Sequence, residues 1–166
     1  MATIFYQLLA DYLHSLLKRY LATAAPPEHR RGRALFAPLP VRLGSRRFRD
    51  PDVIYLRPER LKKLHGQPDG ADLVVEIVSE GKENRDRDLV TKRAEYAAAG
   101  IEEYWIVDPE FRSITVLTLV AADPPQYREH GVFAAGTTAT SALLVGFAVD
   151  VSDLFAQADT AGESAS

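Results

Sequence analysis

Apolar residues recur at three- and four-residue spacing near the start of the chain. The repeating positions are Ile4, Leu8, Leu9, Tyr12, Leu13, Leu16, Leu17 and Tyr20. This spacing predicts an amphipathic helix over residues 3–22, and Pro26 and Pro27 end it. A second helix is predicted over residues 87–99, because Gly100 supplies a natural C-terminal stop.

Short apolar runs bounded by turn residues predict the strands. The run DLVVEIV at residues 72–78 is β-branched and almost wholly apolar, which is typical of a central strand covered on both faces. The polar stretch 79–86 is expected to be a loop, and Ser152 is expected to cap a last turn through Phe155. Further strands are predicted at 34–43 (broken by Pro38 and Pro40), 53–56, 104–107 and 114–120, with weaker ones around Phe133 and at 147–151.

The order of these elements indicates an α/β (α+β) domain with a mixed sheet. A chain of 166 residues suits one domain, which we place at residues 1–157, and the small polar residues 158–166 are expected to form a disordered tail. The composition is 46% hydrophobic and 26% charged, which excludes disordered and fibrous classes.

Several kinds of protein and of site are excluded by what the sequence lacks. There is no apolar run long enough to span a membrane, and Asp11 and His14 interrupt the N-terminal segment, so it is not a secretory signal. The chain has no cysteine, no glycine-rich phosphate loop and no metal-ligand spacing among its four histidines. A cytoplasmic protein is therefore expected, and carboxylates remain as the candidate chemistry.

Glu76 is the most unusual of these carboxylates, because it interrupts the most apolar predicted strand. An isolated buried carboxylate costs several kcal/mol, so Glu76 must be protonated, paired or holding a cation. Asp52 begins the predicted strand 53–56 and could meet Glu76 across neighbouring strands to bind a hard divalent cation. The alternatives are a Glu76 paired with an arginine and an Asp52 that merely follows Pro51 in a turn.

Lys92 lies on the predicted helix that follows the Glu76 strand. Position 78, two residues after Glu76 and on the same face, suits a catalytic lysine but holds Val78, so Lys92 could reach in from the helix instead. The alternative is an ordinary surface ion pair between Asp88 and Lys92 at i and i+4.

The charged residues are unevenly distributed along the chain. Seven arginines and no acid lie between residues 30 and 49, although the chain carries a net charge of −3. Such a stretch suits a surface that approaches phosphates, or else a solvated loop whose arginines pair with nearby acids.

Four segments together resemble a known family. The sequence is similar to the Uma-two-type family of putative restriction endonucleases, in the PD-(D/E)XK nuclease superfamily, over roughly residues 5–155. The segments are Arg49–Val53 (RDPDV), Ala71–Ser79 (ADLVVEIVS), Arg87–Tyr96 (RDLVTKRAEY) and Ala99–Pro109 (AGIEEYWIVDP).

The resemblance implies a restriction-endonuclease-like αβββαβ core with a mixed central sheet, and Mg²⁺-dependent hydrolysis of DNA phosphodiester bonds, with Mn²⁺ as a substitute. By position, it implies that Asp52 and Glu76 are catalytic metal ligands and that Lys92 assists them. It also implies that Asp72 and Asp88 support this group. The arginines expected to contact DNA phosphates are Arg42, Arg46, Arg47 and Arg49, and a homodimer would suit double-strand cutting.

The sequence departs from the family pattern at several places. Family members usually begin with a segment carrying a Glu and a Gly before the first helix, whereas this sequence starts at that helix. Tyr6 stands where a His is common, and Ser79-Glu80 replaces the usual Ser-Pro. Two other hypotheses therefore stay open: a catalytically impaired relative that binds nucleic acid or a protein, and a purely structural domain with Glu76 paired to an arginine.

Overall fold

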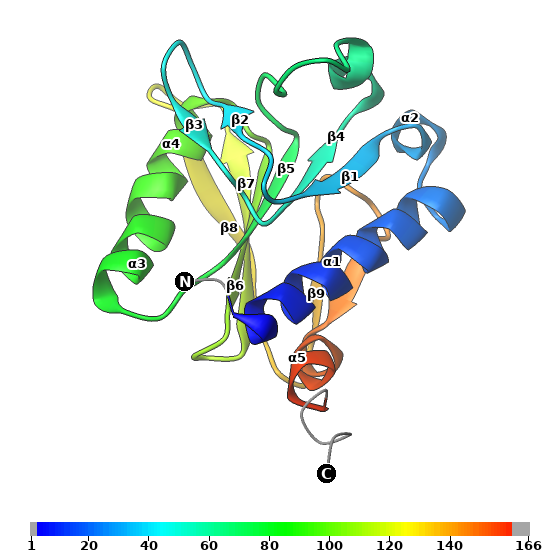
Figure 1. The fold of residues 1–166 in the computed structure, drawn as a ribbon, viewed down its shortest axis with the longest axis vertical. Coiled ribbons are helices and arrows are strands. Elements are labelled where there is room, and N and C mark those ends of the chain that lie inside the picture. The colour runs from blue at the N-terminus through cyan, green and yellow to red at the C-terminus, as the bar shows by residue number, and fades with distance from the viewer. Residues whose placement is uncertain (1–2, 161–166) are drawn as a thin grey trace.

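A mixed six-stranded sheet forms the centre of the molecule, whose computed structural model describes residues 3–160 (Figure 1). Only β5 and β6 run parallel, and every other neighbouring pair is antiparallel. In spatial order the strands are β1 (Arg33–Phe36), β4 (Val53–Leu56), β5 (Leu73–Ile77), β6 (Glu103–Asp108), β7 (Ser113–Val120) and β8 (Gln126–Ala134). The expected mixed α/β class is confirmed.

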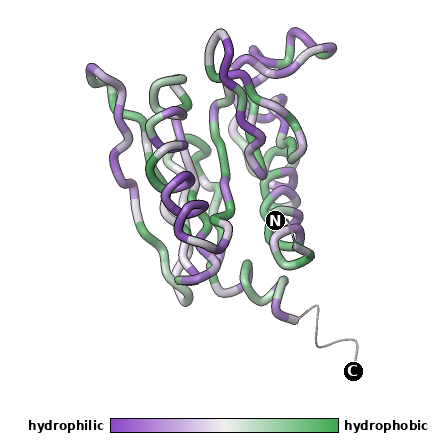
Figure 2. The backbone as a smooth tube through the Cα atoms, turned by 60° about the vertical axis from the view of Figure 1, so that its left-hand side comes forward, coloured by the Kyte–Doolittle hydropathy of each residue, from purple (hydrophilic) through white to green (hydrophobic). Residues whose placement is uncertain are grey.

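Helices cover both faces of this sheet, so each face has its own hydrophobic core. Helices α1 (Ile4–Thr23) and α5 (Val151–Asp159) cover one face. The other face is covered by one continuous helical segment made of α3 (Lys82–Asp86), the π-helical turn η2 (Arg87–Thr91) and α4 (Lys92–Ala98). Figure 2 shows hydrophobic and hydrophilic residues alternating along these helices, as expected when one side faces a core.

The connection between β5 and β6 positions the candidate site. The helical segment 82–98 joins the two strands and lets them run parallel, so their carboxyl ends meet at one edge of the sheet. Together with α1, β1 and β4, this unit reproduces the expected αβββαβ order. All five residues of β5 are buried, as predicted for a central strand covered on both faces.

The second helix begins five residues earlier than the sequence predicts. Residues 82–86, expected to be loop, form α3, which contains no buried residue and so carries no apolar period to reveal it. Its Arg85 instead pairs with Asp108 at 2.8 Å and with Glu110 at 3.1 Å, and these ion pairs hold the helix start against the end of β6.

The predicted strand 34–43 is divided by its prolines into two elements. Its first part is the edge strand β1, whereas β2 (Val41–Arg42) pairs with β3 (Phe48–Arg49) to form a separate hairpin. We call residues 41–49 the β2–β3 hairpin. The remaining short elements are α2 (Pro27–Arg30), η1 (Pro58–Lys62), β9 (Thr138–Thr140) and β10 (Ala148–Asp150).

The last helix is longer than expected and is capped by a different residue. Asp150, rather than Ser152, accepts a hydrogen bond from the Asp153 amide at 2.8 Å and caps α5. The helix runs to Asp159, two residues past the expected domain boundary, because Ala158 packs into the core beneath it. Residues 161–166 of the expected tail lie outside the described residues. Within residues 3–160, no helix is both long and apolar enough to cross a membrane.

Candidate active site

The pairing of β4 with β5 brings Asp52 and Glu76 together. Val53 lies opposite Val75 in this antiparallel pair, so the same register places Asp52 opposite Glu76. Residues directly opposite in an antiparallel pair point to the same face, and here it is the face covered by α4. Asp52 Oδ2 accepts a hydrogen bond from the Ile77 amide at 2.7 Å, which fixes the carboxylate beside the end of β5.

Glu76 is buried, with 3% of its surface exposed, and both its carboxylate oxygens have a partner. Tyr96 donates its hydroxyl hydrogen bond to Oε1 at 2.5 Å, and Lys92 Nζ lies 2.9 Å from Oε2. The partner cation is thus a lysine and not the arginine of the structural alternative. Burial raises the pKa of Glu76 to about 7, and Lys92 opposes this rise while Asp52 adds to it.

Asp52 shares this electrostatic environment. Burial raises the pKa of Asp52 above its usual value, and the Ile77 amide hydrogen bond and the Lys92 charge partly counter that effect. Two carboxylates facing each other in a poorly solvated position are each harder to ionise without a cation nearby.

Lys92 joins two of the candidate carboxylates. Its ammonium nitrogen lies 2.8 Å from Asp88 Oδ1 as well as 2.9 Å from Glu76 Oε2. The i,i+4 pair between Asp88 and Lys92 therefore exists, but it is buried rather than on the surface, since 3% and 13% of these side chains are exposed. Burial lowers the pKa of Lys92, but the two carboxylates more than offset this, so the pKa is raised and the ammonium stays charged.

A wide helical turn presents Asp88 and Lys92 to the sheet. In this π-helical turn the Lys92 amide donates to the carbonyl of Arg87, five residues back. Such turns are often found at functional sites because they shift the register of the side chains that follow. The Tyr104 hydroxyl donates to the Asp88 carbonyl at 2.8 Å and ties the turn to β6.

Tyr96 and Tyr104 are functional candidates that our sequence reasoning did not assign. Their rings meet edge to face with centroids 5.1 Å apart, and both are fully buried. Burial, with Glu76 next in effect, holds the pKa of both phenols far above the usual value, so each remains a hydrogen-bond donor. One signal was available: Tyr96 follows Lys92 by four residues, which puts both on one face of the helix.

Asp72 is the predicted site residue that the structure places apart from the others. It shares a face of β5 with Glu76, but four residue steps along the strand place the two about 13 Å apart. Its carboxylate is held by the Arg57 amide at 2.7 Å and by Arg60 Nε at 3.0 Å. The described residues thus give Asp72 no contact with Asp52 or Glu76.

The β2–β3 hairpin is attached to helix α4 through one acidic residue. Arg49 makes two hydrogen bonds to the Glu95 carboxylate, at 2.7 and 2.9 Å, and Arg47 Nε lies 3.7 Å from it. Because Glu95 follows Lys92 by three residues, the hairpin and the candidate lysine are fixed to the same helix.

The other two predicted phosphate-binding arginines, Arg42 and Arg46, form no ion pair with Glu95 within residues 3–160. Arg42 pairs with Asp69 at 3.2 Å and lies over the Phe48 ring at 5.4 Å. Arg46 is exposed and has no ion pair among the described residues 3–160. The alternative of a solvated loop whose arginines pair with acids therefore holds for Arg42, Arg47 and Arg49. Of these four arginines, Arg46 is the most available to a ligand.

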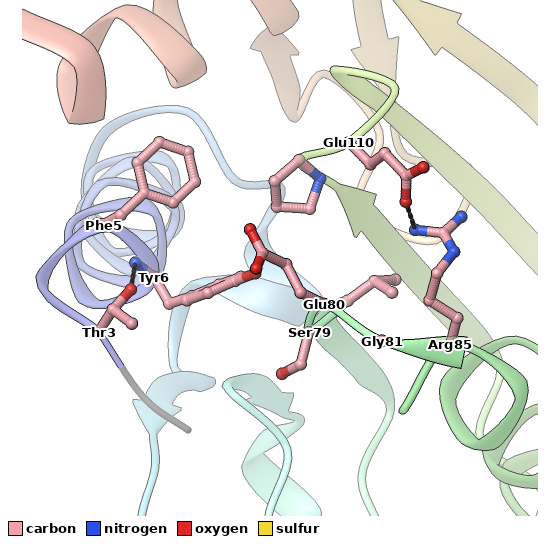
Figure 3. Close-up of a pocket in the computed structure, with 10 residues that line it drawn as sticks. Thr3, Phe5, Tyr6, Ser79, Glu80, Gly81, Arg85 and Glu110 are labelled. Atoms are coloured by element: carbon pink, nitrogen blue, oxygen red, sulfur yellow. Dashed lines mark hydrogen bonds and ion pairs between the residues drawn. The ribbon is translucent and has the colours of Figure 1, made fainter. Parts of the chain in front are cut away.

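A cavity of about 700 Å³ opens at the carboxyl ends of β5 and β6, and its lining does not include Asp52, Glu76 or Lys92. Asp52 lines a separate cavity of about 120 Å³ together with Asp11 and His14 of α1. Val78 and Ser79, which follow Glu76 in the chain, form one wall, and the Tyr6 side chain from α1 reaches toward Glu80 (Figure 3). The opposite wall carries Arg85, paired with Glu110. The carboxyl ends of parallel strands are a frequent location for ligand sites in α/β sheets.

The carboxylates of Asp52, Glu76 and Asp88 supply some, but not all, of the oxygen ligands that a hard divalent cation requires. Oxygen donors suit Mg²⁺ and Mn²⁺, and Asp88 Oδ1 is a buried oxygen that the Lys92 ammonium approaches to 2.8 Å without an aligned hydrogen bond within residues 3–160. In the part of the chain that the structure describes, no three His, Asp or Glu residues converge as a complete ligand set. Asp52 and Glu76 would therefore be the protein ligands, and the remaining positions would belong to water or substrate, which is usual for Mg²⁺.

Comparisons with known proteins show the family and the fold of the chain. The Uma2 family model, described as "Putative restriction endonuclease", matches residues 8–152, a range that includes Asp52, Glu76 and Lys92. Among solved structures, the chain is similar to a putative nuclease belonging to DUF820 from Anabaena variabilis, with 16% sequence identity and a TM-score of 0.71. The match covers 95% of this chain and 84% of that one, and at this identity it shows a shared fold. No curated protein matches the chain.

Proposed function

This chain belongs to the Uma2 family of putative restriction endonucleases, and from that premise we propose that it is a Mg²⁺-dependent endonuclease that hydrolyses DNA phosphodiester bonds. The observation that carries the proposal is the convergence of Asp52, immediately before β4, with Glu76 of β5 and Lys92 of α4. A domain with only a structural role has no need for two facing carboxylates and a buried lysine at one edge of its sheet.

The chemistry of the substrate explains these residue types. A phosphodiester is anionic and repels a nucleophile, and a divalent cation supplies charge neutralisation and an activated water when bound. Asp52 and Glu76 would hold that cation. Lys92 carries a charged ammonium beside Glu76, where it can orient the attacking water or stabilise the negative charge that develops on the phosphate oxygens.

The β2–β3 hairpin supports DNA as the partner. Its arginines would contact backbone phosphates, which gives binding that depends on salt and little on sequence. Replacing exposed Arg46 by Ala should weaken DNA binding and reduce the slope of log affinity against log salt by about 1. Fluorescence anisotropy over a salt series measures both quantities, and an unchanged slope would remove Arg46 from the proposed surface.

Nicking of supercoiled plasmid with Mg²⁺ or Mn²⁺ tests the activity. We expect Glu76→Gln to lower the cleavage rate by about 100-fold or more, because the amide loses the charge that a cation requires. Glu102→Gln is the matched control: Glu102 pairs with Arg57 at the far end of the parallel strand pair, so this variant should cut like the wild type.

Two results would contradict the proposal. Cleavage that survives Glu76→Gln would mean that the activity arises elsewhere or from a contaminant. A folded wild type that cuts no DNA with either cation, yet binds it, would favour the catalytically impaired relative.

A further inference from the structure

We infer that Tyr96 is a positioning residue that sets the orientation of the Glu76 carboxylate, an inference that rests on the proposed metal-dependent activity. Tyr96 lies on α4, has no exposed surface, and donates its only hydroxyl hydrogen to Glu76 Oε1. Because its side chain is fully buried and its hydroxyl is bonded to Glu76, we expect it to act through that carboxylate and not on the substrate directly.

The two oxygens of Glu76 are divided between two partners on one helix. Oε1 accepts from Tyr96 and Oε2 lies beside Lys92, four residues earlier in the same helical segment. The terminal torsion of a glutamate is broad, so a carboxylate with one flexible partner would rotate freely. The phenol removes this freedom and, together with Lys92, holds the two carboxylate oxygens in one orientation.

Tyr96 is itself held in place by a second tyrosine. Tyr104 packs edge to face against it, with an angle of 76° between the rings, and donates its hydroxyl hydrogen to the Asp88 carbonyl. Two acids contact Lys92. Tyr96 holds the carboxylate of the first, Glu76, and Tyr104 holds the backbone of the second, Asp88. Hydrogen-bond partners behind metal-binding side chains orient them, and their loss typically costs about 10–100-fold in metal affinity or activity.

Binding of Mn²⁺ in the absence of DNA, followed by electron paramagnetic resonance, tests this inference. We expect Tyr96→Phe to weaken Mn²⁺ binding by about 10–100-fold. Tyr127→Phe is the matched control, because Tyr127 belongs to the same ring cluster and donates to the Ile101 carbonyl at 2.7 Å, away from the carboxylates. It should lose one buried hydroxyl and keep the wild-type Mn²⁺ affinity.

A second variant keeps the test decisive if Tyr96→Phe folds poorly. 4-Fluorophenylalanine at position 96 fills much of the volume of the hydroxyl without donating a hydrogen bond, so it should weaken Mn²⁺ binding as Tyr96→Phe does. In cleavage assays both variants should lower kcat per folded molecule and leave the KM for DNA unchanged. A general loss of folded protein would lower only the concentration of active enzyme, and kcat per folded molecule would stay at the wild-type value.

The Glu76→Gln variant separates failure of this inference from failure of the proposed function. If Glu76→Gln weakens Mn²⁺ binding but both position-96 variants bind like the wild type, only the role of Tyr96 is overturned. If the wild type binds no Mn²⁺, or Glu76→Gln binds it equally well, the metal site and the role of Tyr96 are overturned together.

Discussion

Two buried glutamates lie on the neighbouring parallel strands β5 and β6, and they differ in what satisfies them. Glu103 is fully buried and faces the opposite side of the sheet from Glu76. Its carboxylate accepts four hydrogen bonds: from Trp105 Nε1 at 2.6 Å, Ser141 Oγ at 2.6 Å, and the amides of Ala142 at 2.9 Å and Leu143 at 2.8 Å. Neutral donors, two of them in the backbone, thus saturate this carboxylate.

Glu76 has fewer partners, and both are side chains. One of these partners is a cation, and a second carboxylate, Asp52, faces Glu76 across the strand pair. The comparison teaches that burial alone does not identify a functional carboxylate. The Glu103 carboxylate, enclosed by neutral donors, connects separate parts of the fold. The Glu76 carboxylate is paired with a lysine and faces a second acid, so a bound cation could replace the lysine as its partner.

The largest expected effect on stability is at Glu103. Replacing it by Ala should lower the free energy of unfolding by about 3–5 kcal/mol, since several buried donors lose their acceptor at once. Urea denaturation measures this loss. A loss below about 1 kcal/mol would mean that water replaces the carboxylate, and the contrast between the two glutamates would fail.

A pH-dependent effect is expected at Glu76. Its pKa rises from 4.5 to about 7 on folding, so the folded state binds the proton more tightly and stability falls as pH increases between these values. In EDTA, the free energy of unfolding of the wild type should therefore fall by about 3 kcal/mol relative to Glu76→Gln over this range.

Urea denaturation of both proteins at several pH values measures that difference. Parallel curves for the wild type and Glu76→Gln would show that Glu76 ionises normally. Saturating Mg²⁺ should restore part of the stability of the wild type at pH 7 and leave Glu76→Gln unchanged.

The smallest effect is expected at Ser141, which links Glu103 to a loop. Its hydroxyl donates to Glu103 Oε1 and accepts from the Leu144 amide at 2.8 Å. Ser141→Ala should cost about 1–2 kcal/mol of unfolding free energy and leave plasmid cleavage unchanged. Reduced cleavage in a fully folded Ser141→Ala protein would show that the Glu103 network reaches the candidate site.

The sequence predicts Glu76 better than Glu103 for a physical reason. Glu76 interrupts an apolar strand, so its conflict with burial is visible in one short segment. Glu103 stands at the start of a strand beside Glu102, where a charged residue usually faces solvent. Its donors near Ser141 lie almost forty residues later, and such a contact exists only after folding.

The face of a strand on which a residue lies was easier to predict than the partners that surround its side chain. Strand alternation correctly places Asp72 and Glu76 on one face, but it does not show that Arg57 and Arg60 already enclose Asp72. The role of Tyr96 was hidden for the opposite reason, because an aromatic residue on the buried side of a helix is fully explained by packing.

The attachment of the β2–β3 hairpin to α4 fixes the distance between the hairpin anchor and Lys92 along this helix. Glu95 anchors Arg49 and follows Lys92 by three residues, about 4.5 Å along the helix axis. A DNA strand that rests on the hairpin, as proposed above, would therefore meet Lys92 at a spacing set by the helical rise of α4 for as long as the Arg49–Glu95 pair is kept.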